Sequence, residues 1–275
     1  GIYGLLGSNG AGKSTIMNIM CGVLKQTEGD IYIKGINTRI DPVEAKCHIG
    51  FLPQQPPLHP DLTVEEYLDY SARLRYIPHK EIPAAITEVV EKCGISHFRR
   101  RLIRNLSGGY QQRVGIAQAI IHNPDFIILD EPTNGLDPNQ IVEIRNLIKQ
   151  IAQERTVILS THILPEVQAT CEYIYMVEKG KMVFSGTVDE FDNYILPTTI
   201  RVTLLAHPTV EELTMIPGLV AAQHLGEMDY RLQFADARNM VDEIIETCGI
   251  HNWRLSQVYM EKSSLDVVFA ELSKK

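Results

Sequence analysis

The sequence holds few of the features that mark a membrane-embedded, disulfide-bonded or zinc-binding chain. No apolar stretch among its 275 residues approaches the roughly 18 residues that a membrane-spanning helix requires. Its five cysteines lie far apart without a C-x-x-C pair, and its nine histidines are scattered without an H-x-x-x-H pair. This spacing predicts neither a disulfide framework nor a zinc site and is typical of a protein in the reducing cytosol.

The chain also lacks the basic excess that nucleic-acid binding requires. Its formal net charge is −8, from 26 basic and 34 acidic side chains. The charge is divided evenly, because 19 basic and 23 acidic residues through Pro197 give −4, and 7 and 11 after it give −4 again. The one basic cluster, Arg99–Arg101 with Arg104, is typical of a solvated loop. No nucleic-acid partner is therefore expected.

What the sequence does contain is a glycine-rich loop with the spacing G-x-x-x-x-G-K-S at residues 7–14. The apolar run Ile2–Leu6 precedes it and predicts a buried strand, while apolar residues at helical spacing follow Ser14. Strand, loop and helix in this order place a phosphate group at a helix N-terminus, where unpaired N–H groups and the helix dipole favour an anion. A merely flexible turn would not explain why Lys13 and Ser14 follow directly.

Two further stretches add acidic groups and a second place for an anion. The run Phe126–Asp130 predicts a central parallel strand that delivers Asp130 and Glu131 to the carboxyl edge of a sheet. That edge is where α/β folds bind ligands. Ser107, followed by two glycines, is expected to cap an amphipathic helix. A hydroxyl and bare N–H groups beside a positive helix end form the second anion site.

Together these stretches resemble the ATP-binding-cassette (ABC) ATPases, and the resemblance covers the chain from Gly1 to about Phe191. It implies a Mg-dependent ATPase with a P-loop, RecA-like α/β core over residues 1–197 and a helical subdomain at about 55–110. The implied ATP-binding Walker A residues are Gly7, Ser8, Asn9, Gly10, Ala11, Gly12, Lys13, Ser14 and Thr15. The implied signature residues that bind ATP are Ser107, Gly108, Gly109 and Gln111.

The remaining motifs of the family imply the chemistry. The residues that the resemblance assigns to catalysis are Lys13, Gln54, Glu131 and His162. Those that it assigns to the Mg²⁺ ion are Ser14, Gln54 and Asp130, the last through water. In this scheme Glu131 polarises the attacking water, and His162 grips the γ-phosphate. Asp137, in the family's D-loop, would connect two sites across an interface.

The resemblance also implies partners. Ser107 and Gly109 lie far from the Walker A loop within one chain, so each phosphate groove lacks half of its ligands. The family solves this with a head-to-tail dimer that encloses two ATP molecules, and a second ATPase subunit, most simply a second copy, is expected. Transmembrane permease subunits are the other expected partner. They would place this chain at the cytoplasmic face of the cell membrane as a peripheral subunit.

Two other functions share part of this pattern. Soluble cassette ATPases that act on nucleic acid or the ribosome commonly insert a long coiled coil before the signature or carry two cassettes. Here Lys13 and Ser107 are 94 positions apart, and the chain has one cassette. A stand-alone P-loop kinase would need neither the signature nor His162. The sequence favours the motor subunit of a transporter, with the soluble cassette ATPase as the alternative.

The pattern changes after Pro197. Alternating apolar residues and short amphipathic segments predict the order β-α-β-β-α-β between residues 200 and 258, followed by a helix at 264–272. Residues 198–275 are expected to form a small ferredoxin-like α+β accessory domain. The ending Ser264–Leu272 resembles ATPase subunits of bacterial ABC-2-type exporters.

The family normally carries two more strands before Walker A, with an aromatic residue that stacks on adenine. This sequence begins at Gly1, inside the strand that enters the loop. We therefore expect it to be a fragment whose adenine-stacking residue lies upstream.

Overall fold

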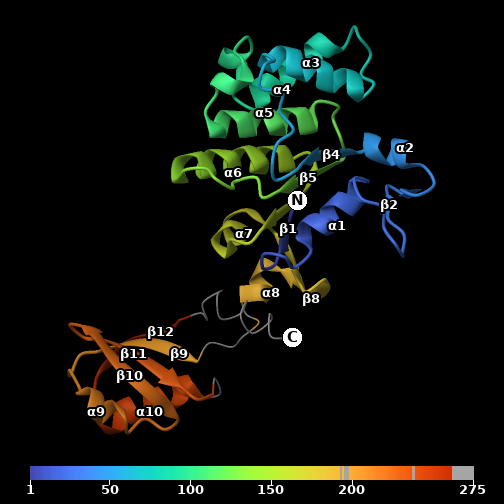
Figure 1. The fold of residues 1–275 in the computed structure, drawn as a ribbon. Helices are drawn as coiled ribbons and strands as arrows, with labels where there is room; N and C mark the ends of the chain where they lie inside the picture. The colour runs from blue at the N-terminus through green and yellow to red at the C-terminus, as the bar shows by residue number, and fades with distance from the viewer. Residues whose placement is uncertain (193, 195–197, 237–238, 262–275) are drawn as a thin grey trace. The chain divides into compact units, whose positions relative to one another are not determined.

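The computed structural model describes residues 1–192, 194, 198–236 and 239–261. The chain forms two compact units, Gly1–Val188 and Asp189–Lys275 (Figure 1). Within the described residues no helix combines the length and the apolar character needed to cross a bilayer.

The first unit is built on a six-stranded sheet with the strand order β4-β5-β6-β1-β7-β8. The first five strands pair in parallel, and β8 runs antiparallel to β7. The strands are β1 (Ile2–Leu6), β4 (Ile49–Leu52), β5 (Phe126–Asp130), β6 (Thr156–Thr161), β7 (Tyr173–Glu178) and β8 (Lys181–Thr187). The central strands are apolar and buried on both faces, which is the usual condition for a parallel sheet.

Helices connect the parallel strands of this unit. They are α1 (Lys13–Met20), α2 (Pro42–Cys47), α6 (Pro138–Ala152) and α7 (Leu164–Thr170). Helix α8 (Val188–Asp192) follows β8 and begins at the last residue of this unit. The short strand β2 (Tyr32–Ile33) pairs with β3 (Ile36–Asn37). The two form a separate hairpin that is not part of the main sheet. Ile33 is buried in the core of the first unit, and Ile31 and Ile36 pack against that core.

The segment of the chain that connects β4 to β5 contains three helices that pack on one another (Figure 1). They are α3 (Val64–Leu74), α4 (Ile82–Lys92) and α5 (Gly108–Ile120), with the 3₁₀ turns η1 (Ser96–Phe98) and η2 (Ile103–Asn105) between the last two. Thr63 and Glu66 form the capping box that the sequence predicts for α3. Gly94, with φ 66°, follows the end of α4 as the expected left-handed cap.

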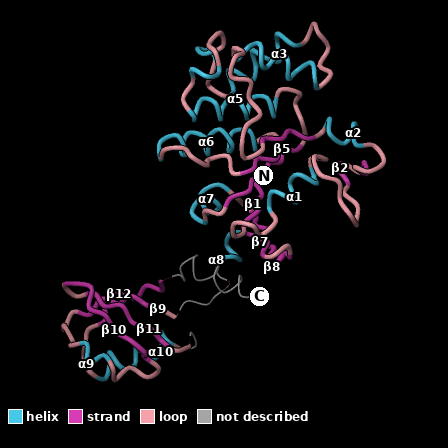
Figure 2. The backbone as a smooth tube through the Cα atoms, viewed as in Figure 1, coloured by secondary structure: helices cyan, strands magenta, loops and turns pink. Residues whose placement is uncertain are grey.

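The second unit has the element order β9-α9-β10-β11-α10-β12. Its elements are β9 (Thr199–Leu204), α9 (Val210–Leu213), β10 (Leu219–Gly226), β11 (Asp229–Phe234), α10 (Met240–Ile250) and β12 (Leu255–Glu261). The antiparallel strand order β10-β11-β9-β12 gives this unit a ferredoxin-like topology (Figure 2). The helix expected at 264–272 lies outside the described residues.

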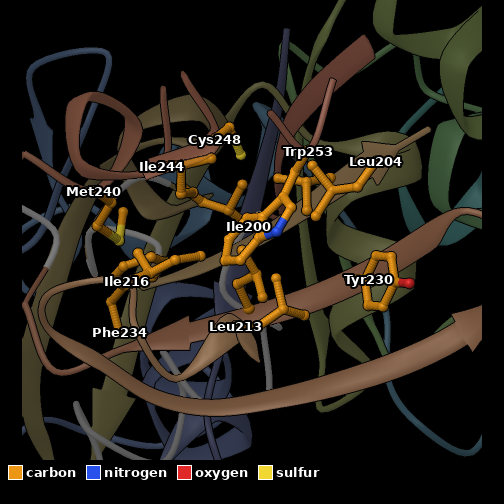
Figure 3. Close-up of a cluster of buried hydrophobic side chains, with 12 residues drawn as sticks. Ile200, Leu204, Leu213, Ile216, Tyr230, Phe234, Met240, Ile244, Cys248 and Trp253 are labelled. Carbon is orange, nitrogen blue, oxygen red and sulfur yellow. The ribbon is translucent and has the colours of Figure 1, made fainter. Parts of the chain in front are cut away.

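One face of this small sheet packs on its two helices. Trp253, Leu213 and Ile200 lie together in the resulting core (Figure 3). Ile200, Val202 and Leu204 alternate along β9 and are all fully buried. The apolar side chains at every second position of β9 therefore all face one core, as the alternation in the sequence predicts.

The backbone of β4 passes so close to α5 that only glycine fits at position 50. A Cβ on Gly50 would lie 2.1 Å from the carbonyl oxygen of Ala119. We expect Gly50→Ala to lower the free energy of unfolding of the first unit by about 1–3 kcal/mol, because backbone would have to move. Gly249→Ala is the matched control, since nothing described lies within 4 Å of its Cβ position and alanine favours α10.

Urea unfolding followed by circular dichroism measures the first effect. Fluorescence of Trp253, the single tryptophan of the chain, follows the second unit. An unchanged unfolding midpoint for the first unit in Gly50→Ala would contradict the close approach of β4 and α5.

Candidate functional site

The glycine-rich loop joins β1 to α1 and has the backbone that a phosphate cradle needs. Gly10 and Gly12 adopt φ values of 83° and 109°, which side chains with a Cβ rarely tolerate. The Lys13 ammonium turns back over the loop and donates to the carbonyl oxygens of Gly7 and Ser8 at 2.9 and 3.0 Å. Burial lowers the pKa of Lys13, and the carboxylates of Glu131, Asp130 and Glu178 oppose this shift.

The β7–β8 hairpin supports this loop from the adjacent strand. A Cβ on Gly7 would lie 2.2 Å from the carbonyl oxygen of Val177, so the loop can approach β7 only as glycine. The backbone N–H of Gly180 donates to the carbonyl of Ala11 at 2.9 Å. Sequence reasoning missed this hairpin support, because the contacts join segments about 170 positions apart and no local pattern marks them.

Glu178 forms a second contact of the hairpin with the loop. The hydroxyl of Ser8 donates to the Glu178 carboxylate at 2.8 and 3.0 Å. A hydrogen bond to an ionised acceptor is stronger than one between neutral groups, so it fixes the Ser8 side chain away from the cavity.

The carboxyl ends of β5 and β6 bring the acidic pair to the loop. Asp130 is buried and accepts a hydrogen bond from the Ser160 hydroxyl of the neighbouring strand. Glu131 follows with φ 48°, and its N–H donates to the backbone carbonyl and the hydroxyl of Ser160 at 3.2 and 3.0 Å. A left-handed glutamate at the end of a central strand is a strained position of the kind that clusters at functional sites.

Three predicted side chains meet at the Glu131 carboxylate. One of its oxygens accepts from the Gln54 amide at 2.9 Å, and the other lies 3.0 Å from Nδ1 of His162. The side chain of Glu131 is 11% exposed, against 39% for His162. Gln54 comes from the segment after β4 and His162 from the segment after β6, so the parallel sheet delivers all three to one edge.

These groups border a cavity of about 570 Å³. Its lining consists of Asn9, Gly10, Gly12, Lys13, Ser14, Thr15, Gln54, Glu131, Asn134 and His162. Asn134 was missed by sequence reasoning, although it stands in the turn that follows Glu131. Of the predicted Walker residues, Gly7, Ser8, Ala11 and Asp130 are not on this lining.

The signature residues stand at a separate place on the same unit. Ser107 and Gly108 are exposed at the start of α5, and the described part of the chain offers the Ser107 side chain no capping hydrogen bond. Ser107 and Gly109 line a small cavity of about 150 Å³, together with Gln140 of α6. Neither borders the large cavity. The structure therefore does not bring the signature and the Walker A loop together within one chain.

Gln111 of the signature and Asp137 of the D-loop have hydrogen-bond partners that the sequence did not indicate. The Gln111 amide donates to the backbone carbonyls of Ile103 and Leu106, both at 3.2 Å, so it holds the turn that enters α5. Asp137 caps α6 by accepting from the N–H groups of Asn139 and Gln140 at 3.0 Å. In the single chain both side chains thus organise helix N-termini.

Comparison with known proteins agrees with this geometry. A family profile described as "ABC transporter" matches residues 1–134. The ABC transporter ATP-binding protein NatA of Bacillus subtilis is 36% identical over 68% of this chain and 77% of its own length. The bacitracin transport ATP-binding protein BcrA of Bacillus licheniformis is 41% identical over 66% of this chain, which spans 59% of BcrA.

A solved structure shows the same fold. It is the dimeric, post-hydrolysis state of the ATP-binding cassette MJ0796 bound to ADP and Pi, with a TM-score of 0.61 and 30% identity over 68% of this chain and 85% of that chain. The likeness covers the unit that holds the phosphate loop and the acidic pair. On these matches and on the site geometry, the chain belongs to the ABC transporter family of ATP-binding-cassette ATPases.

Proposed function

We propose that this chain is the ATP-hydrolysing motor subunit of a membrane ABC transporter of the ABC-2 exporter type. The observation that carries the proposal is the meeting of Gln54 and His162 at the Glu131 carboxylate, beside the phosphate loop and its lysine. A phosphate binder without hydrolysis would not need a carboxylate held between an amide and an imidazole. The exporter type is supported by the resemblance of residues 264–272 and by similarity to a bacitracin transport protein.

In this mechanism the triphosphate of ATP lies along the loop, and Lys13 releases the Gly7 and Ser8 carbonyls to bind phosphate oxygens. Glu131 orients a water molecule and accepts its proton as the water oxygen bonds to the γ-phosphorus, while the bond from the γ-phosphorus to the β–γ bridging oxygen breaks and ADP leaves. His162, already 3.0 Å from Glu131, holds that carboxylate and contacts the γ-phosphate. The Gln54 amide donates a hydrogen bond to the other oxygen of the Glu131 carboxylate. A movement of Glu131 would therefore also move the segment after β4.

The same cavity has the oxygen donors that suit Mg²⁺, which is bound by carboxylate, hydroxyl and amide oxygens together with substrate phosphates. Ser14 and Gln54 line the cavity, and Asp130 is buried. These residues would hold the ion, Asp130 through water. When bound, the ion neutralises the charge that develops on the phosphate oxygens.

The exposed signature supports a second copy of the chain as partner. Ser107 and Gly108 have a hydroxyl and free N–H groups at a helix N-terminus but no anion site of their own chain to complete. A head-to-tail dimer would place them on the other subunit's ATP. The dimeric state of the MJ0796 cassette is consistent with this arrangement.

An apolar groove on the first unit supports a permease as the other partner. It has a volume of about 360 Å³ and is lined by residues of α2, β4, the segment that follows α1 and the end of α3. Its rim leaves Val23, Val43, Leu74 and Tyr76 between 59% and 80% exposed. Arg75 and Lys46 also line it. We assign to it a cytoplasmic helix of the permease with an apolar face and an acidic residue, which would hold this chain at the cytoplasmic face.

The domain assignment of the proposal is residues 1–197 for nucleotide binding and residues 198–275 for an accessory domain. Every residue with a proposed catalytic role lies in the first of these. The second, with its own core and sheet, is proposed to act on the dimer and not on the chemistry.

Replacing the acidic residue after Asp130 tests the hydrolytic mechanism. Glu131→Gln should retain ATP binding and lower the hydrolysis rate by about a hundredfold or more, because glutamine cannot accept the proton. Phosphate release and equilibrium ATP binding measure the two effects. Glu154→Gln is the control, since Glu154 is exposed and pairs with Lys92 at the surface. Near-normal turnover of the Glu131 variant would remove it from the role of base.

A charge placed in the signature tests the shared site. Ser107→Arg should leave ATP binding to the monomer almost unchanged and abolish both ATP-dependent dimerisation and hydrolysis, because the loop completes the other subunit's site. Size-exclusion chromatography of the variant in the Glu131→Gln background measures dimerisation. Ser96→Arg, on the exposed turn η1, is the matched control. Loss of ATP binding by a monomeric sample would contradict the sandwich.

The groove contains the one exposed thiol among the five cysteines, Cys47. Burial raises the pKa of Cys21, Cys93 and Cys171 to about 12 and also raises that of Cys248, so these thiols stay protonated and unreactive at neutral pH. A maleimide–polyethylene glycol reagent should therefore attach once, at Cys47, and leave basal ATP hydrolysis unchanged.

The attached polymer should prevent the chain from sedimenting with inside-out vesicles that carry its natural permease. Cys47→Ser treated with the same reagent is the control and should still sediment. Equal sedimentation of labelled and unlabelled protein would show that the permease docks elsewhere.

A further inference from the structure

A buried carboxylate next to the site has no place in the mechanism above. Glu166, on α7, is 4% exposed. Its oxygens accept from the Thr133 hydroxyl at 2.8 Å and from the Thr161 hydroxyl at 3.0 Å. The guanidinium of Arg145, on α6, lies 3.5 Å away. Four segments of the first unit thus meet at one side chain.

The Thr161 contact reaches His162 through the backbone. Thr161 immediately precedes His162, and its hydroxyl also accepts from the N–H of Ile163 at 3.0 Å. The hydroxyl therefore closes a turn around the histidine while it donates its proton to Glu166. A shift of Glu166 would open this turn and change the direction of the imidazole.

The Thr133 contact reaches Glu131 in the same way. Thr133 stands two residues after Glu131, in a turn that is closed by the N–H of Asn134 donating to the Glu131 carbonyl at 3.1 Å. On its other side this turn is held by the buried Gln112 amide, which donates to the Pro132 carbonyl at 2.8 Å. Glu166 and Gln112 therefore grip the turn from α7 and α5.

We propose that Glu166 is a positioning residue that sets the geometry between Glu131 and His162. One carboxylate holds the turn that carries the base and the turn that carries the histidine, so their 3.0 Å separation is fixed by a common support. The inference rests on the proposed hydrolytic roles of Glu131 and His162. Glu166 itself faces the two threonines and takes no part in the chemistry.

The charge of Glu166 argues for orientation over stability. Burying a carboxylate is costly, and a buried ion pair is often no more stabilising than an apolar replacement. Here the cation is at 3.5 Å, and the Nε atom of Arg145 is buried without a hydrogen-bond partner in the described part of the chain. The pair is thus poorly matched, whereas the two hydroxyls donate charge-assisted hydrogen bonds to the carboxylate at 2.8 and 3.0 Å.

Alanine and glutamine at position 166 separate positioning from packing. Glu166→Ala should lower kcat for ATP hydrolysis by about tenfold to a hundredfold, since displacements near 1 Å at a reacting group have effects of that size. KM and the ATP dissociation constant should stay within about twofold, because the phosphate loop is not part of the network. Glu166→Gln keeps an acceptor oxygen for the threonines and should recover most of kcat.

Thr161→Val removes one hydroxyl without changing the size of the side chain. Alone it should lower kcat, and in the Glu166→Ala background it should add little, because both changes break the same contact. Thr170→Val is the matched control, on the helix α7 that also carries Glu166. The Thr170 hydroxyl is buried and has no partner among the described residues. It should leave kcat unchanged.

Unchanged kcat in Glu166→Ala, with or without a lower unfolding temperature, would overturn the inference. If the alanine variant does not fold, unchanged kcat in Thr161→Val would overturn it in the same way. The outcome is separable from that of the proposed function. Near-normal turnover of Glu131→Gln would refute the hydrolytic site itself, whereas a dead Glu131→Gln with a fully active Glu166→Ala refutes only the positioning role.

Discussion

The parallel pairing of β5, β6 and β1 is the constraint on which the site depends. Its register sets Asp130 opposite Ser160, and Thr161 opposite Leu6 at the entrance to the phosphate loop. Because the three strands are parallel, the segments that follow them all leave the sheet at its carboxyl edge. Burial of apolar side chains on both faces holds this register, because a slip of one residue would break their close packing against the helices that cover the sheet. The polar site is therefore positioned by an apolar sheet.

Much of this architecture could be predicted from local sequence patterns, and the α/β fold class is confirmed. The phosphate loop has a fixed spacing, Thr63 and Glu66 form a capping box within four residues, and Gly94 ends its helix in the left-handed conformation. The element order of the second unit also follows from alternating apolar residues. The roles given to the site residues stay predictions, which are supported by the convergence of Gln54, Glu131 and His162 with part of the phosphate loop at one cavity.

What the sequence could not show are pairings between distant segments. The Ser8–Glu178 contact spans 170 positions, and the Thr133–Glu166 contact spans 33. A glutamate on a short helix has the same sequence signal whether it faces solvent or two buried hydroxyls. For β2, composition indicated a strand but not its partner, since pairing with β3 or with the main sheet would need the same apolar residues.

The phosphate loop has most of its acceptors already occupied. Its hydrogen-bonded carbonyls are those of Gly7 and Ser8, bound by the lysine, Ala11, bound by the hairpin, and Gly12, bound by the helix. The backbone groups of the loop that remain available for hydrogen bonding are thus mainly N–H donors. A cation that entered the cradle would find few lone pairs to replace its water, whereas an oxyanion would meet the N–H groups at the start of α1. The loop therefore favours an anion over a cation even before a ligand binds.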